Sequence, residues 1–207
     1  MADDPLAESY ARAFDGRLMP GRRPALLLVD MVVAYLDPAS PFFCETSAGA
    51  LACAVRLRQT ARKAGRPVFY SSVVYQPGGA DGGLFYRKIP ALSVFDDGSP
   101  LGAFPQELAP AVGEQVITKQ YPSAFFGTSL AAEMSALDVD TLVIGGFSTS
   151  GCVRASALDA LQSGFAPFVV REACADRHEQ PHQQNLFDLQ AKYAEVIGEG
   201  EACAILG

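Results

Sequence analysis

The sequence predicts an α/β fold, a three-layer α/β/α sandwich around a mostly parallel sheet of about six strands. Short apolar runs have the length and composition of buried strands, at 24–30, 67–74, 115–118, 140–147 and 167–171. Amphipathic patterns typical of helices separate most of them. Strands that alternate with helices of about ten or more residues form βαβ units, and such units produce a parallel sheet covered by helices.

The elements follow one another in a regular order. PALLLVD at 24–30 is a continuous apolar run that ends in an acid, as in a strand buried on both faces, and the four later runs resemble it. Gly65 and Gly164 end two of the helical patterns, which is a common place for glycine. The expected helices are 47–64, 128–137, 151–164 and 182–192. A final short strand is expected near 202–206.

One long irregular region interrupts this order at 75–113. It is rich in Gly, Pro and Asp, and it is longer than a loop that only connects two elements usually is. We therefore expect it to act as a lid, a pocket wall or a subunit contact. No repeat or second domain is evident, so residues 1–207 are predicted to form a single domain.

The charge and hydropathy of the chain disfavour two classes of partner. The formal net charge is −7, and no Lys/Arg run is longer than Arg22-Arg23, so a nucleic-acid partner is not expected. No apolar stretch approaches the span of a bilayer, and the N-terminus is acidic and polar, unlike a signal peptide. We expect a cytoplasmic protein with no membrane partner.

Cys152 has the setting of a reactive thiol. The five cysteines are odd in number, widely spaced and free of a CxxC pair, so neither a disulfide framework nor a zinc site is indicated. Cys152 alone lies near the start of a predicted helix, where free N–H groups and the helix dipole favour a thiolate. The small polar residues from Ser148 to Gly151 could form an oxyanion hole. The alternative is a small buried residue that packs helix against sheet.

Two charged residues at other strand ends are candidate partners of this thiol. Asp30 follows ALLLV and Lys119 follows QVIT, so both should lie at the same rim of a parallel sheet as Cys152. A carboxylate can take the thiol proton, and an ammonium can hold both negative charges. Taken singly, each could be an ordinary capping acid or solvated lysine. A Cys-His pair with His178 or His182 is less favoured, since both lie in a polar stretch.

These residues and their order resemble the isochorismatase-like cysteine hydrolases. The likeness runs from about residue 24 to the C-terminus and rests on LLLVD, VITKQYPSAFFGTSL and GGFSTSGCVRASALDALQSGF. Within the family, STSGCVRAS and CADR look most like N-carbamoylsarcosine and maleamate amidohydrolases. The resemblance implies that Asp30 is the general base, Cys152 the nucleophile and Lys119 the charged third member. It also implies a cis peptide at Phe147-Ser148 and an oxyanion between the backbone N–H groups of Ser148 and Cys152.

The resemblance further implies how a substrate would be held. Arg177 corresponds to an arginine that grips the substrate carboxylate, and its planar guanidinium suits that task. Arg87 is a second basic candidate, and Thr149 in the nucleophile turn a third binding residue. Arg154 is expected to hold the loop or a subunit contact.

The same resemblance sets expectations for chemistry and partners. It implies release of ammonia from a small carboxylate-bearing amide or ureido compound, with N-carbamoylsarcosine favoured over maleamate, in a dimer or tetramer. Nicotinamidase-type relatives carry an Asp-x-His metal motif, but this chain has no histidine before His178, so neither metal nor cofactor is expected. The rival from another class is a thiol redox sensor or a binding module.

Overall fold

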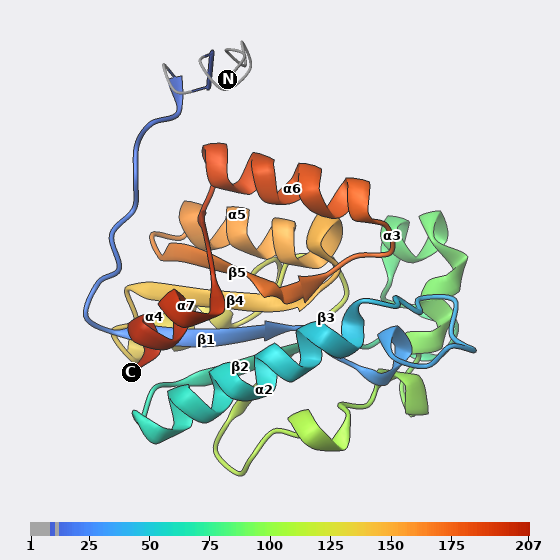
Figure 1. The fold of residues 1–207 in the computed structure, drawn as a ribbon. Coiled ribbons are helices and arrows are strands. Elements are labelled where there is room, and N and C mark those ends of the chain that lie inside the picture. The colour runs from blue at the N-terminus through green and yellow to red at the C-terminus, as the bar shows by residue number, and fades with distance from the viewer. Residues whose placement is uncertain (1–8, 11–12) are drawn as a thin grey trace.

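The computed structural model describes residues 9–10 and 13–207. Its centre is a six-stranded sheet in the order β3-β2-β1-β4-β5-β6, and every pairing is parallel (Figure 1). The strands are β1 (Pro24–Val29), β2 (Val68–Val73), β3 (Gln115–Lys119), β4 (Thr141–Phe147), β5 (Ala166–Ala175) and β6 (Glu195–Ile197). The strand order reverses between β1 and β4. In open parallel sheets such a switch point, at the carboxyl ends of the strands, is where ligands bind.

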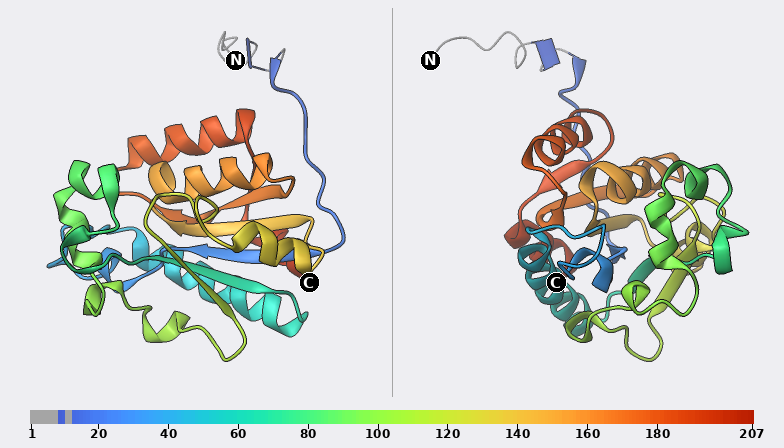
Figure 2. Two further views of the ribbon diagram at one scale, coloured as in Figure 1. Left: turned by 180° about the vertical axis from the view of Figure 1, so that it is seen from behind. Right: turned by 90° about the vertical axis from the view of Figure 1, so that its right-hand side faces the viewer.

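Helices cover both faces of the sheet, which confirms the predicted three layers. One face carries α2 (Ser47–Lys63) and α7 (Glu199–Leu206), and the other carries α4 (Leu130–Ala136), α5 (Arg154–Gln162) and α6 (Glu179–Lys192) (Figure 2). Among the described residues, no helix combines the length and apolar character needed to cross a membrane.

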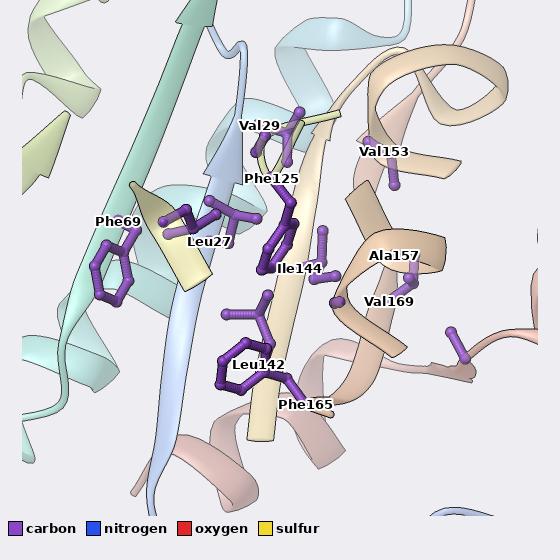
Figure 3. Close-up of a cluster of buried hydrophobic side chains, with 14 of the residues drawn as sticks. Leu27, Val29, Phe69, Phe125, Leu142, Ile144, Val153, Ala157, Phe165 and Val169 are labelled. Atoms are coloured by element: carbon purple, nitrogen blue, oxygen red, sulfur yellow. The ribbon is translucent and has the colours of Figure 1, made fainter. Parts of the chain in front are cut away.

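The central strands are apolar on both sides because each side packs a separate core. In β1, Leu27 and Val29 join the cluster under α4, α5 and α6, whereas Leu26 and Leu28 join the cluster under α2 and α7. Figure 3 shows the first cluster, with Leu27 of β1 near Ile144 of β4. Side chains alternate between the faces of a strand, so a strand covered twice needs an unbroken apolar run. Within the run at 24–30, the six apolar residues before Asp30 meet this requirement and form β1.

The C-terminal prediction was wrong. Residues 202–206 lie in α7, and the last strand is the earlier three-residue β6. Ala202 and Leu206, four residues apart, are both fully buried and share one face of α7. The apolar letters of ACAIL therefore follow a helical period, which five residues are too few to reveal.

The region 75–113 contains short helical segments that pack over the carboxyl ends of β1 and β2. They form a third apolar cluster that includes Val32, Leu92 and Phe95. Backbone hydrogen bonds from Tyr75 to Phe95 and from Asp97 to Tyr75 anchor the first half. The segments are η2 (Pro77–Gly79), α3 (Gly83–Lys88), η3 (Pro90–Phe95), η4 (Pro100–Gly102) and η5 (Gln106–Leu108).

Candidate active site

A buried ion pair joins the ends of β1 and β3. The Lys119 Nζ lies 2.7 Å from the Asp30 Oδ2, and the two side chains are 0% and 3% exposed. Ser71 of the intervening strand β2 donates its hydroxyl to the other carboxylate oxygen at 2.9 Å. Asp30 has a positive φ of 51°, which an aspartate tolerates better than most residues. Both oxygens of the Asp30 carboxylate thus have a fixed partner.

The Lys119 ammonium is surrounded by acceptors. Besides Asp30, it donates to the backbone oxygens of Tyr121 and Pro122, each at 3.0 Å, and it lies 3.6 Å from the Cys152 Sγ. Burial lowers the pKa of Lys119, but the negative charge of Asp30 and the hydrogen bonds to Asp30 and Cys152 outweigh burial, so the pKa is raised. Lys119 therefore remains a cation beside the sulfur.

Cys152 lies in a π-helical turn, η6 (Thr149–Val153), between β4 and α5. The turn closes through hydrogen bonds from the N–H groups of Gly151 and Val153 to the carbonyl of Ser148. Burial raises the pKa of the Cys152 thiol to about 12; the charge of Lys119 lowers it, whereas that of Asp30 raises it further. The direction of this shift is opposite to the expectation that the helix start would favour the thiolate.

The peptide between Phe147 and Ser148 is cis, as the resemblance implied. Just before it, Gly146 has a φ of 154°, and a Cβ there would lie 2.3 Å from the backbone oxygen of Val29. Only glycine permits this approach of β4 to β1. The turn that carries Cys152 therefore begins close against β1, which ends just before Asp30.

A cavity of about 230 Å³ opens beside the Cys152 sulfur. Its polar lining comes from the turn that carries Cys152 and the residues after β5, and includes Ser148, Asp176 and Arg177. Most of its lining is apolar, and four of the apolar residues come from the region 75–113. The apolar residues are Tyr35, Phe42, Val73, Phe85, Ile89, Leu92, Phe95, Pro122 and Ala175. Such a site suits a small compound with few polar groups.

Comparison with known proteins places this site in a family. A family profile described as the isochorismatase domain matches residues 24–200. The chain belongs to the isochorismatase family. It is 44% identical to a maleamate amidohydrolase of Pseudomonas putida over 94% of this chain and 92% of that protein. It is 37% identical to an N-carbamoylsarcosine amidase of an Arthrobacter species over 89% and 72%.

Solved structures of the family share the fold. A cysteine hydrolase from Pseudomonas syringae superposes with a TM-score of 0.86 at 21% identity, over 91% of this chain and 95% of that one. At this identity the likeness concerns the fold alone. It agrees with the isochorismatase-like sandwich predicted from the sequence.

The structure brings some of the predicted substrate residues to the cavity and leaves others outside it. Arg177 lines the cavity, and its Nη2 donates to the backbone oxygen of Pro41 at 2.6 Å. Arg87 of α3 lies instead in a separate surface depression beside Gly79. Thr149 is buried, and its hydroxyl pairs with the Nδ1 of His182 at 2.8 Å.

Contacts of His182 and Arg154 support this isochorismatase-family site in ways that differ from the sequence expectations. His182 of α6 contacts the turn that carries Cys152 through Thr149, although its surroundings suggested a surface residue. Arg154 bonds Asn185 and Asp188, so it ties α5 to α6. Within residues 9–10 and 13–207, no group of three or more His, Cys, Asp or Glu side chains is arranged to hold a metal ion.

Three further residues that contact the candidate site or line its cavity were not predicted from the sequence. Ser71 could have been noticed as a polar residue within a buried strand, and Asp176 as the acid beside Arg177. The Asp176 carboxylate accepts from the N–H of Ser150 at 2.6 Å and from that of Arg177 at 2.8 Å, so it joins the turn that carries Cys152 to the end of β5. Tyr35 gave no signal, because its place depends on how the chain turns after β1.

Proposed function

We propose that this protein is a cysteine-dependent amidohydrolase that releases ammonia from a small amide bearing a carboxylate. The observation that carries the proposal is the cluster of Asp30, Lys119 and Cys152 at one edge of a small cavity that Arg177 also lines. Nucleophile, base and cation lie within one buried group of atoms, and a guanidinium can hold a carboxylate with two hydrogen bonds.

The proposed chemistry depends on the two protonation states of Cys152, the thiol and the thiolate. A thiol with a pKa of about 12 stays protonated until a substrate is bound, and the thiolate of such a weakly acidic thiol is a strong nucleophile. Asp30 takes the proton as sulfur attacks the amide carbon. Lys119 limits the build-up of negative charge on the carboxylate and sulfur.

Collapse of the intermediate releases ammonia. The backbone N–H groups of Ser148 and Cys152 would hold the oxyanion, and Asp30 returns its proton to the leaving nitrogen. Water then loses a proton to the same carboxylate and cleaves the thioester, which regenerates the thiol and frees the acid. A ureido substrate would give a carbamate, which decays to carbon dioxide and an amine.

Maleamate is the first substrate to test, and N-carbamoylsarcosine the second. The first compound is favoured by the 44% identity to the maleamate amidohydrolase and by the apolar cavity walls, against which a flat four-carbon acid can pack. The second is supported by the 37% identity to the N-carbamoylsarcosine amidase. This order reverses the preference that the sequence motifs suggested.

The test is ammonia release by the purified protein from each compound, with Cys152→Ala as the inactive control. We expect turnover of maleamate, and a covalent adduct on Cys152 that intact-protein and peptide mass spectrometry detect when the reaction is quenched with acid. Turnover of neither compound would exclude both substrates. An active Cys152→Ala variant would overturn the proposed mechanism, and peroxide-dependent oxidation of Cys152 without any hydrolysis would favour the redox-sensor alternative.

A further inference from the structure

Tyr35 projects from the segment that follows the catalytic strand β1. It ends the short helix η1 (Val33–Tyr35), five residues beyond Asp30. Its ring packs against Phe147, Phe42 and Phe95, with centroid separations of 5.3, 5.8 and 6.4 Å. Three aromatic neighbours restrict the ring, so the position of its hydroxyl is fixed by packing.

The Tyr35 hydroxyl is available to a ligand. Tyr35 lines the cavity and is only partly buried, and within the described residues its hydroxyl makes no hydrogen bond. The neighbouring polar groups are already used: the Cys44 thiol donates to the backbone oxygen of Asp176 at 2.8 Å, and the Asp176 carboxylate accepts two backbone N–H groups. Because Tyr35 lines the cavity, a ligand bound there can accept a hydrogen bond from this hydroxyl without displacing a protein partner.

The electrostatic surroundings keep this hydroxyl protonated. Burial raises the pKa of Tyr35 well above its ordinary value, and the carboxylates of Asp30 and Asp176 raise it further, whereas Arg177 lowers it. Tyr35 therefore offers a neutral O–H donor at any physiological pH. A neutral donor can approach an anion without adding charge to the cavity.

We propose that the Tyr35 hydroxyl donates a hydrogen bond to the substrate carboxylate, and that Tyr35 and Arg177 together select amides that carry an acid group. The inference rests on the proposed function. The Nη2 of Arg177 donates to the backbone oxygen of Pro41, so only the other N–H groups of the guanidinium are left to bind a substrate in the cavity. The carbonyl of the scissile amide is assigned to backbone N–H groups, and its NH₂ group needs acceptors. The substrate carboxylate is therefore the group that still needs a second hydrogen-bond donor besides Arg177.

The experiment compares two substrates that differ only at the acid group. One is maleamate, and the other is (Z)-but-2-enamide, in which a methyl group replaces the carboxylate. In Tyr35→Phe we expect kcat/KM for maleamate to fall about tenfold or more through a higher KM, as for a lost hydrogen bond to a charged group. Turnover of the neutral amide should stay within about twofold of the unchanged protein, because the ring and its packing are kept.

Tyr86→Phe is the matched control, and two outcomes overturn the inference. Its hydroxyl bonds Asp96 at 3.0 Å and does not line the cavity, so its kinetics should not change. An unchanged KM for maleamate in Tyr35→Phe would exclude the contact. An equal loss on both amides would show that the hydroxyl acts on chemistry or structure rather than on the acid group.

A binding measurement separates this inference from the proposed function. Maleate, the acid that maleamate hydrolysis would yield, is titrated calorimetrically into the unchanged protein and into Tyr35→Phe. Weaker binding by the variant supports the Tyr35 contact even if maleamate is not hydrolysed, a result that would count against the proposed substrate alone. Equal binding, or no binding to the unchanged protein, overturns the Tyr35 contact.

Discussion

The sheet edge and the region 75–113 both contribute residues to the candidate site, but they position them in different ways. At the edge, Asp30, Lys119 and Cys152 are at most 8% exposed and follow or end strands of one hydrogen-bonded ladder. Phe85 and Ile89, which line the cavity, come instead from short helical segments that are partly exposed. The proposed reacting groups are thus fixed by the strand register, whereas the apolar cavity wall formed by the region 75–113 rests on local packing.

The register explains why the edge tolerates so little change. Val29 pairs with Ser71 and with Gly146, and Val73 pairs with Lys119. A shift of any strand by one residue would move a side chain to the other face of the sheet. Loops, in contrast, tolerate substitution and often carry binding residues. We therefore expect mutations at the edge to abolish chemistry and mutations in the wall to change substrate affinity.

The largest effect is expected from Asp30→Asn. Loss of the general base should lower kcat by roughly a thousandfold, within the usual range for this form of catalysis. The variant also leaves the buried Lys119 ammonium without its anion, so the free energy of unfolding should fall by about 3 kcal/mol. Ammonia release and urea denaturation measure the two effects.

Cys152→Ala separates these effects, because it keeps the Asp30–Lys119 pair. We expect it to lose activity as completely as Asp30→Asn while retaining most of its stability. A folded Asp30→Asn variant with activity within twofold of the unchanged protein would exclude the carboxylate as the base, and with it the proposed catalytic group.

The sequence predicted the sheet edge better than the cavity wall, because strand register places the edge residues and local packing places the wall. Asp30 and Lys119 could be placed together because parallel strands end at a common rim, whatever the loops do. The partner of Thr149 and the position of Tyr35 could not be predicted, because each depends on contacts between segments distant in sequence or on an irregular turn. Arg87 illustrates the limit, since a basic residue within a long irregular region of the sequence need not face the cavity.

The thiol of Cys152 provides the second test, because the sequence and the structure predict opposite directions for its pKa. With a pKa raised to about 12, the thiolate fraction should rise about tenfold for each pH unit. The rate of alkylation of Cys152 by iodoacetamide should thus rise roughly a hundredfold between pH 7 and pH 9, as followed by peptide mass spectrometry. A rate that is constant above pH 7 would instead indicate a thiolate stabilised by Lys119 and the helix start.

The smallest effect is expected in the wall, from Ile89→Ala. Ile89 lines the cavity at the junction of α3 and η3, and its truncation removes apolar contact with a bound substrate but touches no reacting group. KM for maleamate should rise by about threefold to tenfold, in line with the loss of a few methylene contacts in an apolar pocket, while kcat changes by less than twofold. Steady-state kinetics separate the two constants.

Leu84→Ala is the control within the same segment, because Leu84 is 73% exposed and does not line the cavity. It should leave both KM and kcat unchanged. If both variants raised KM equally, the effect would come from loosening of α3 rather than from contact with substrate. If Ile89→Ala lowered kcat as strongly as KM rose, the wall would help to orient the amide at Cys152, and the division between a catalytic edge and a binding wall would fail.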